Sequence, residues 1–273
     1  MLFRSTSEIA EYATKIAATK GIVAVVPPQV INDDVRLVAY QSMLPRTPES
    51  QELIHNLRDI TAPAGTLIGG VAADYTDSQD GISSTLPWAF GWITLSVLIL
   101  VFIFTGSIIL PIKAVLLNVL SLAATMGVLT WVFIDGNLRW LVGDFTLTGS
   151  VDTSIVILIA VVVFGLSMDY ELFLLSRIRE EHLQGRSNIE SVATGLQRSA
   201  RIITAAAVLL AVVFAAFVTS GVTSIKSMGF GVALAVILDA TVIRALLVPA
   251  LMRLFGERNW WAPKSLQRFT LKH

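Results

Sequence analysis

Five hydrophobic segments of about 20 residues follow one another after residue 85, and each is long enough to cross the hydrocarbon core of a membrane as a helix. We place them at about 86–105, 112–134, 153–176, 200–220 and 227–251. Only 15% of the 273 residues are charged, against about 25% in soluble domains, and the mean hydropathy is +0.72. The chain is therefore predicted to be an α-helical integral membrane protein with a membrane domain over residues 84–255.

Residues 1–83 have a different pattern, in which short amphipathic helices are combined with short strands. The expected elements are a helix ending near residue 19, strands at 22–26 and 35–40, a helix at 48–60 and a third strand at 66–71. This order, α-β-β-α-β, is that of a ferredoxin-like unit without its first strand. We therefore predict a partial ferredoxin-like α+β domain at 1–83 whose module begins upstream of Met1.

The distribution of Lys and Arg predicts the orientation of the spans. Basic residues are concentrated after the third and fifth spans, at Arg177, Arg179, Arg186, Arg198, Arg201, Arg253, Arg258, Lys264, Arg268 and Lys272. Both regions are expected to be cytoplasmic, including a tail at 256–273, and this leaves the N-terminal domain extracytoplasmic. Export of that domain requires either a preceding span or a longer protein of which this chain is the C-terminal piece.

The basic loop between the third and fourth spans contains its own helix signal. Ser187 and Glu190 fit a capping box at the start of a helix at about 187–198. Apolar residues then recur on one stripe, including Val192 and Leu196. This amphipathic helix is expected either to lie on the cytoplasmic face of the membrane or to pack on neighbouring segments as a connector.

Several function classes are excluded by what the sequence lacks. The net charge is zero, so nucleic-acid binding is not expected, and the absence of cysteine removes disulfides, thiolate zinc sites and a cysteine nucleophile. The histidines His55, His182 and His273 are scattered, and no metalloprotease, P-loop or dinucleotide-binding motif is present. We therefore predict that the chain is not an enzyme and holds no cofactor or metal.

Asp169 is the strongest candidate for a functional residue, because it interrupts a hydrophobic span. A charged Asp at such a depth costs about 3 kcal/mol on insertion scales, so the side chain is expected to face the interior of the helix bundle. On a helical wheel Tyr170 and Arg177 flank the same half of the helix, whereas Glu171 points the other way. A carboxyl group that gains and loses a proton would serve a proton pathway; the alternative is a structural acid bonded to a neighbouring helix.

Other polar residues in the spans are predicted to support this site or the packing around it. Thr204 can either hydrogen-bond Asp169 or contribute only to a small-residue packing face. Arg177 is expected to extend toward the lipid headgroups or to act with Asp169, and Glu171 is expected to meet an Arg from another helix. Asp239 and Arg244 are five residues apart and should not face each other on an α-helix, so Asp239 is expected to pair with Arg198 or Arg201 or to form a second proton site.

The segment around Asp169 resembles a signature of the MMPL family of the RND transporter superfamily. It reads Phe-Gly-Leu-Ser-Met-Asp-Tyr-Glu-Leu-Phe-Leu-Leu-Ser-Arg-Ile-Arg-Glu-Glu at 164–181, and further similar segments lie at 69–74, 201–207, 238–250 and 259–263. The resemblance implies that the chain is the C-terminal part of such a protein, with spans eight to twelve and the end of the second extracytoplasmic porter domain. It further implies that Asp169 and Tyr170 are the second Asp-Tyr pair of a proton relay and that Arg177 is the Arg of the same motif.

Members of this family are exporters of lipids and other hydrophobic molecules in the bacterial cell (plasma) membrane, and they are driven by the proton-motive force. The resemblance therefore implies a lipid or hydrophobic substrate, protons as the coupling ion, and an N-terminal half with spans one to seven, or oligomer partners, to supply the other Asp-Tyr pair. Protonation of Asp169 would make and break hydrogen bonds between helices and rock the bundle. The alternative is a non-transporting membrane remnant or an accessory subunit that binds lipid or a partner.

Overall fold

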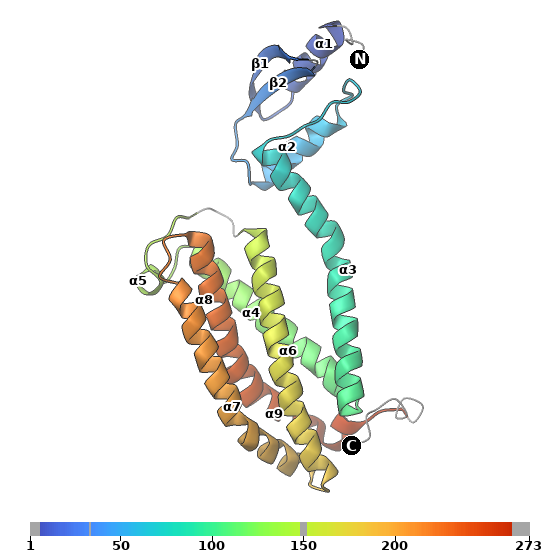
Figure 1. The fold of residues 1–273 in the computed structure, drawn as a ribbon. Coiled ribbons are helices and arrows are strands. Elements are labelled where there is room, and N and C mark those ends of the chain that lie inside the picture. The colour runs from blue at the N-terminus through green and yellow to red at the C-terminus, as the bar shows by residue number, and fades with distance from the viewer. Residues whose placement is uncertain (1–5, 33, 148–151, 264–273) are drawn as a thin grey trace. The chain divides into compact units, whose positions relative to one another are not determined.

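The computed structural model describes residues 6–32, 34–147 and 152–263, and these form two compact units, Met1–Phe90 and Gly91–His273 (Figure 1). The predicted tail at 256–273 is therefore described only as far as Pro263, and Lys264, Arg268 and Lys272 lie outside the described residues. The boundary predicted at residue 83 falls inside a continuous helix, α3, which extends over Val71–Thr105.

The N-terminal unit is a small α+β fold in which two helices cover a two-stranded antiparallel sheet. Its elements are α1 (Thr6–Ala17), β1 (Ile22–Ile31), β2 (Asp34–Gln41), α2 (Pro48–Asp59) and the first part of α3. Val25 pairs with Ala39, and the two strands change register between Val26 and Gln29, where Pro27 and Pro28 lack the N–H groups that a regular ladder needs. The strand predicted to stop at residue 26 therefore continues past an irregularity.

The core of this unit is built by one face of each of its helices. Its buried members come from α1, α2 and the start of α3, and they are Tyr12, Ile16, Leu53, Ile54, Leu57 and Ala73. The third strand predicted at 66–71 is wrong, because within the described residues the sheet has only β1 and β2 and this segment makes no ladder with either. Ile68 instead packs against the core from an irregular segment, and α3 begins at Val71.

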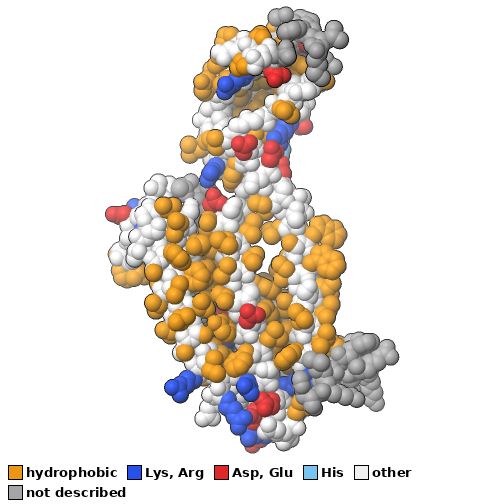
Figure 2. All heavy atoms as spheres, viewed as in Figure 1, with side chains coloured by type: hydrophobic (Ala, Val, Ile, Leu, Met, Phe, Trp, Pro, Cys, Tyr) orange, Lys and Arg blue, Asp and Glu red, His pale blue; other side chains and the backbone are white. Residues whose placement is uncertain are grey.

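The second unit is a bundle of long helices. After the end of α3 it contains α4 (Ile109–Phe133), the short α5 (Arg139–Val142), α6 (Thr153–Leu183), α7 (Asn188–Phe217), α8 (Thr223–Leu238), the π-helix η1 (Asp239–Leu247), α9 (Val248–Phe255) and the 3₁₀-helix η2 (Gly256–Trp260). Within the described ranges, five helices are long and apolar enough to cross a membrane, with α8 to η2 forming one of them. Figure 2 shows hydrophobic side chains over most of the visible face of this bundle.

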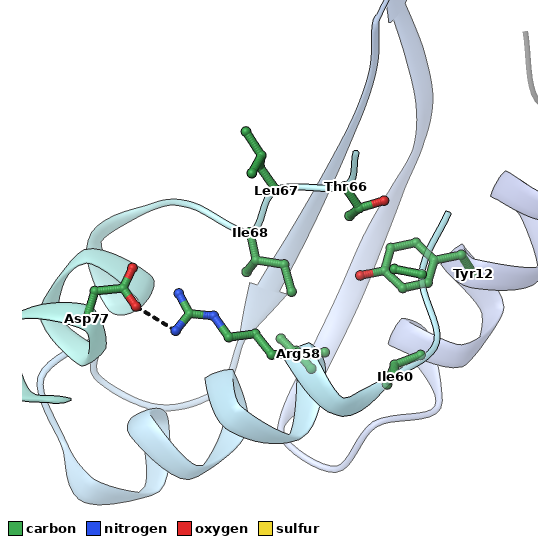
Figure 3. Close-up of a pocket in the computed structure, with 9 residues that line it drawn as sticks. Tyr12, Arg58, Ile60, Thr66, Leu67, Ile68 and Asp77 are labelled. Carbon is green, nitrogen blue, oxygen red and sulfur yellow. Dashed lines mark hydrogen bonds and ion pairs between the residues drawn. The ribbon is translucent and has the colours of Figure 1, made fainter. Parts of the chain in front are cut away.

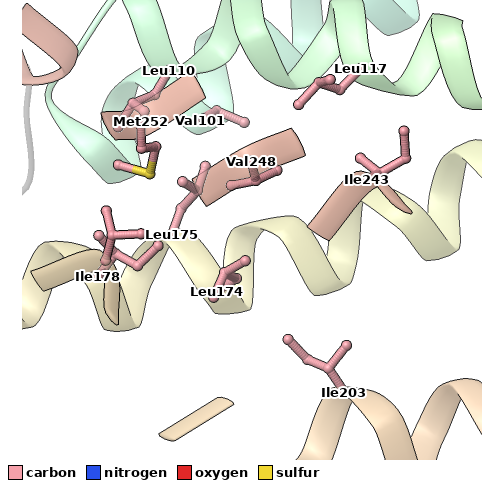
Figure 4. Packing of buried hydrophobic residues seen from close by; sticks show 11 residues of the cluster. Val101, Leu110, Leu117, Leu174, Leu175, Ile178, Ile203, Ile243, Val248 and Met252 are labelled. Carbon is pink, nitrogen blue, oxygen red and sulfur yellow. The ribbon is translucent and has the colours of Figure 1, made fainter. Parts of the chain in front are cut away.

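Two buried hydrophobic clusters hold the bundle together. In one, Leu174, Leu175 and Ile178 of α6 face Val248 and Met252 near the end of the chain (Figure 4). The other lies further along the bundle and joins α4, α6 and α8 through a set that includes Leu129, Ile159 and Val232. Helix α6 contributes to both clusters and packs against α4, α7 and α8, and its exposed positions, which include Val161, Gly165 and Asp169, form an open face.

The helix predicted at 187–198 is not separate from the fourth span. It forms the first turns of α7, which begins at Asn188 and continues to Phe217. The predicted capping box is present: the Ser187 side chain accepts from the backbone N–H of Glu190, whose carboxylate accepts from the backbone N–H of Ser187. Ser191, Val192, Gly195 and Ser199 are buried on one stripe, and the α carbon of Gly195 lies against Ile178 of α6.

Candidate functional site

Asp169 lies on the open face of α6 and is exposed. Asp169 was expected to face the interior of the helix bundle. Within this chain the faces of α6 that contact α4, α7 and α8 carry other residues, such as Ser167, Leu174 and Ile178. Nearby positions on the open face are apolar or small, including Val161 and Gly165. Figure 2 shows an acidic side chain surrounded by hydrophobic ones on the bundle. A charged carboxyl group on such a surface would be costly to expose to lipid.

Tyr170 connects this open face with the interior. It is partly buried, and its ring lies 5.0 Å from the guanidinium carbon of Arg244 in a cation–π contact. Tyr170 also lines a cavity of about 10 Å³, together with Ser167 and Asp239. That volume is at the lower limit for one water molecule. The residue after Asp169 thus reaches a polar site inside the bundle.

Asp239 and Arg244 form the buried ion pair at the centre of this site. They are 6% and 2% exposed, and Asp239 Oδ1 also accepts a hydrogen bond of 2.6 Å from the Ser167 hydroxyl. Arg244 Nη2 donates to the Ser167 carbonyl oxygen at 2.6 Å. Both residues belong to η1, the π-helical segment between α8 and α9, and both bond to Ser167 of α6.

The predicted pairing of Asp239 with Arg198 or Arg201 is wrong. In a π-helix each backbone N–H bonds the carbonyl five residues earlier, so side chains five apart lie on the same side of the helix. Arg244 therefore faces Asp239, although an α-helical wheel places the two side chains on different sides of the helix. Arg198 instead pairs with the buried carboxylate of Glu181, which also forms an ion pair with Arg186 at 2.7 Å.

Glu171 and Lys113 extend the charged site toward α4. Both are buried, at 5% and 9% exposed. Glu171 points away from Asp169, as the helical wheel predicted, and it interacts electrostatically with Arg244, Asp239 and Lys113. An Arg from another helix is therefore near Glu171, as expected. Lys113 Nζ donates to Asn259 Oδ1 at 2.6 Å, which ties the charged site to the end of the chain.

Comparison with known proteins identifies the bundle. The sequence profile of the MMPL family matches residues 32–270, which is most of the chain. This chain belongs to the MMPL family. It is therefore a multi-pass membrane protein of a transporter family, and the α+β unit followed by five membrane helices agrees with the predicted C-terminal part of an MMPL protein.

Three relatives illustrate the similarity. A membrane protein of Streptomyces coelicolor is 44% identical over 81% of this chain and 31% of its own length. The trehalose monomycolate exporter MmpL3 of Mycobacterium tuberculosis is 42% identical over 84% of this chain and 24% of its own length. The mycolic acid-containing lipids exporter MmpL11 of Mycolicibacterium smegmatis is 38% identical over 97% of this chain and 28% of its own length. The chain thus spans about a quarter to a third of these MMPL relatives.

Two of the predicted supporting residues of this MMPL chain do not join the charged site. Arg177 is exposed, pairs with Glu180 at 3.0 Å and packs over the ring of Phe173. Thr204 lies on α7 and is exposed, and of the small residues on its predicted face Ala207 is buried, at 7% exposed. The described residues contain no group of three or more His, Asp or Glu side chains that could hold a metal ion.

Sequence reasoning missed three residues that the MMPL bundle brings to the site: Ser167, Lys113 and Asn259. Lys113 carried a usable signal, since it is a basic residue in an otherwise apolar span and such residues seek a polar partner. Ser167 lies two residues before Asp169 and is therefore on a different face of α6. Asn259 lies beyond the last predicted span, so only the folded chain shows that it returns to Lys113.

Proposed function

We propose that this chain is the C-terminal part of a proton-driven MMPL exporter of lipids, in which Asp169 and Tyr170 form one half of the proton relay. The observation that carries the proposal is the placement of Asp169, an exposed acid on a membrane helix, directly before a tyrosine that contacts a buried ion pair. A charged Asp left in lipid would cost about 3 kcal/mol, so the open face of α6 requires a polar partner. That partner would come from the N-terminal half, with spans one to seven, or from a second copy.

Charge at Asp169 can be transmitted inward through Tyr170. When Asp169 is ionised, it favours a hydrogen bond or cation from the covering helix; when it is protonated, that attraction is lost. Tyr170 lies against Arg244, which is itself held by Asp239 and the Ser167 carbonyl. Alternating protonation would therefore change both the contact of α6 with its partner and the environment of the buried ion pair, and the resulting helix movement would drive the N-terminal unit.

The substrate class follows from the relatives and the membrane setting. Two of the relatives are exporters, one of trehalose monomycolate and the other of mycolic acid-containing lipids. For this chain we propose a lipid with long acyl chains, moved at the outer face of the bacterial cell membrane. In this arrangement the N-terminal unit is extracytoplasmic, and the basic turn between α6 and α7 is cytoplasmic together with the C-terminus, as the distribution of Arg and Lys favours.

The test is lipid export by the assembled protein in proteoliposomes with an imposed pH gradient. Asp169→Asn should abolish gradient-driven export, because the amide cannot exchange a proton. Glu180→Gln is the matched control, since Glu180 is an exposed acid on the same helix and should be dispensable. Unchanged export by Asp169→Asn would overturn the relay. Lipid binding without gradient-driven export in the assembled protein would favour the accessory role instead.

A further inference from the structure

The N-terminal unit contains a cavity of about 330 Å³ that the proton relay does not use (Figure 3). Its lining comes from α1, the end of α2, the irregular segment that follows it and the first turns of α3. Most of the lining is aliphatic and includes Leu57, Ile60 and Ile68. The volume lies in the range of sites that bind small molecules or parts of larger ones.

Tyr12 provides a hydrogen-bond donor in this cavity that has no partner. The residue is 5% exposed, its hydroxyl makes no hydrogen bond with any described residue, and the hydroxyl points into the cavity (Figure 3). Burial raises the pKa of Tyr12, so the hydroxyl stays protonated and available as a donor. A buried hydroxyl without a partner carries a free-energy cost, because it has lost its hydrogen bonds to water. An acceptor atom placed in the cavity would remove that cost.

The other polar groups of the lining already have partners. Arg58 Nη1 and Asp77 Oδ1 form an ion pair at 2.5 Å, and the Thr66 hydroxyl donates to the Pro63 carbonyl at 2.7 Å. The charges of Arg58 and Asp77 cancel, so the cavity carries no net charge that would select an anion or a cation. What remains is an aliphatic wall with one free donor.

We propose that this cavity binds one acyl segment of a lipid ester, with the ester carbonyl accepting a hydrogen bond from Tyr12. The aliphatic wall suits methylene groups, and a neutral carbonyl oxygen suits a neutral hydroxyl donor. The inference rests on the proposed function in its choice of substrate class, and it adds a contact site in the N-terminal unit that is distinct from Asp169 and Tyr170. Binding itself requires no proton transfer.

The experiment uses the full chain in lipid nanodiscs and a long-chain acyl ester that carries a diazirine near its carbonyl. After irradiation, labelled peptides are identified by mass spectrometry. Residues 57–68 should be labelled, and Tyr12→Phe should weaken that labelling about three- to tenfold, which corresponds to the loss of one hydrogen bond. Tyr40→Phe is the matched control, because Tyr40 is 59% exposed on β2 and does not line the cavity. Labelling of the membrane helices serves as the internal standard.

A second variant keeps the proposal falsifiable if Tyr12→Phe perturbs the fold. Ile68→Trp should fill the cavity and remove labelling at 57–68 while the membrane helices remain labelled. An alkane probe of equal length, which has no carbonyl, should label the cavity equally in the native chain and in Tyr12→Phe. Equal ester labelling in the native chain, Tyr12→Phe and Ile68→Trp would overturn the site, as would a protein segment cross-linked in the cavity of the assembled protein.

The outcome separates this site from the proton relay. Asp169→Asn should leave ester labelling at residues 57–68 unchanged, because the relay is not needed for binding. If export continues in Asp169→Asn, the proposed relay is refuted but lipid binding in the cavity is not. If export depends on Asp169 but the ester does not label residues 57–68, lipid binding in the cavity is refuted and the relay is not.

Discussion

Asp239 and Arg244 form a buried ion pair although they lie five residues apart on one helix, because the segment between them is π-helical. Such segments occur often at functional sites, since the extra residue redirects one side chain without ending the helix. Here the redirected guanidinium reaches Ser167 and the ring of Tyr170 on α6. Through these side-chain contacts, the π-helical part of the last span packs against α6, the helix that carries Asp169.

Removing one partner of this pair should strongly destabilise the bundle. Asp239→Asn leaves Arg244 buried without its counter-charge, and such losses typically cost about 3–5 kcal/mol. Glu180→Gln removes the partner of Arg177 in an exposed pair, and it should cost less than about 1 kcal/mol. The free energy of unfolding of each variant can be measured by denaturant titration in mixed micelles. Similar values for the two variants would show that the buried pair is not a structural element.

Asp169 and Asp239 should differ in this respect. Asp169 is exposed within this chain, so Asp169→Asn should change the free energy of unfolding of the chain by no more than about 0.5 kcal/mol. Asp239→Asn should lower it by several times that amount. The same titration compares both variants directly. A large loss of stability for Asp169→Asn would mean that this carboxylate has a structural partner inside the chain.

The sequence predicted the features that depend on local pattern and failed where a partner had to be known. Hydrophobic length located the five spans, and Ser187 with Glu190 located a helix start, because both signals lie within one segment. For Asp169 the sequence indicates only that a charged group in a span favours a polar partner, and it does not indicate which chain supplies that partner. The Asp239–Arg244 pair was missed because the helical wheel assumes α geometry at every residue.

Asn259 is expected to be essential for the packing of the chain end. It is fully buried; its amide donates to the carbonyl oxygens of Met252 and Gly256, both at 2.6 Å, and its Oδ1 accepts from Lys113. Asn259→Ala leaves the buried Lys113 ammonium group without this acceptor, whereas the Met252 carbonyl keeps the Asn188 amide as a donor. The substitution should cost about 2–4 kcal/mol, since an orphaned buried group costs about 1–3 kcal/mol and a charged one more.

A double-mutant cycle tests whether Lys113 is the coupled partner of Asn259. Lys113→Met should be costly in the native chain but nearly neutral in the Asn259→Ala background, where the ammonium group has already lost its acceptor. The cycle is measured by the same unfolding titration. Additive costs for the two substitutions would show that Lys113 and Asn259 do not stabilise each other.

Gly195 permits the closest approach of α6 and α7, and substituting it should separate them. A β-carbon at Gly195 would lie 2.6 Å from Ile178 Cγ1 and 2.9 Å from both the backbone N and the α carbon of Ile178. Gly195→Ala should therefore cost about 1–3 kcal/mol, as overpacking of a filled core does. Shortening the side chain with Ile178→Ala should not rescue the variant, because the contact with the backbone of Ile178 remains.

Gly165 provides the matched control on α6. A β-carbon there would meet nothing within 4 Å, so Gly165→Ala should be neutral or should stabilise the helix by up to about 1 kcal/mol. The two Gly→Ala variants should thus change the free energy of unfolding in opposite directions, although the chemical change is the same. If Ile178→Ala restored Gly195→Ala to native stability, the clash would involve only the side chain, and the close backbone contact between α6 and α7 would be refuted.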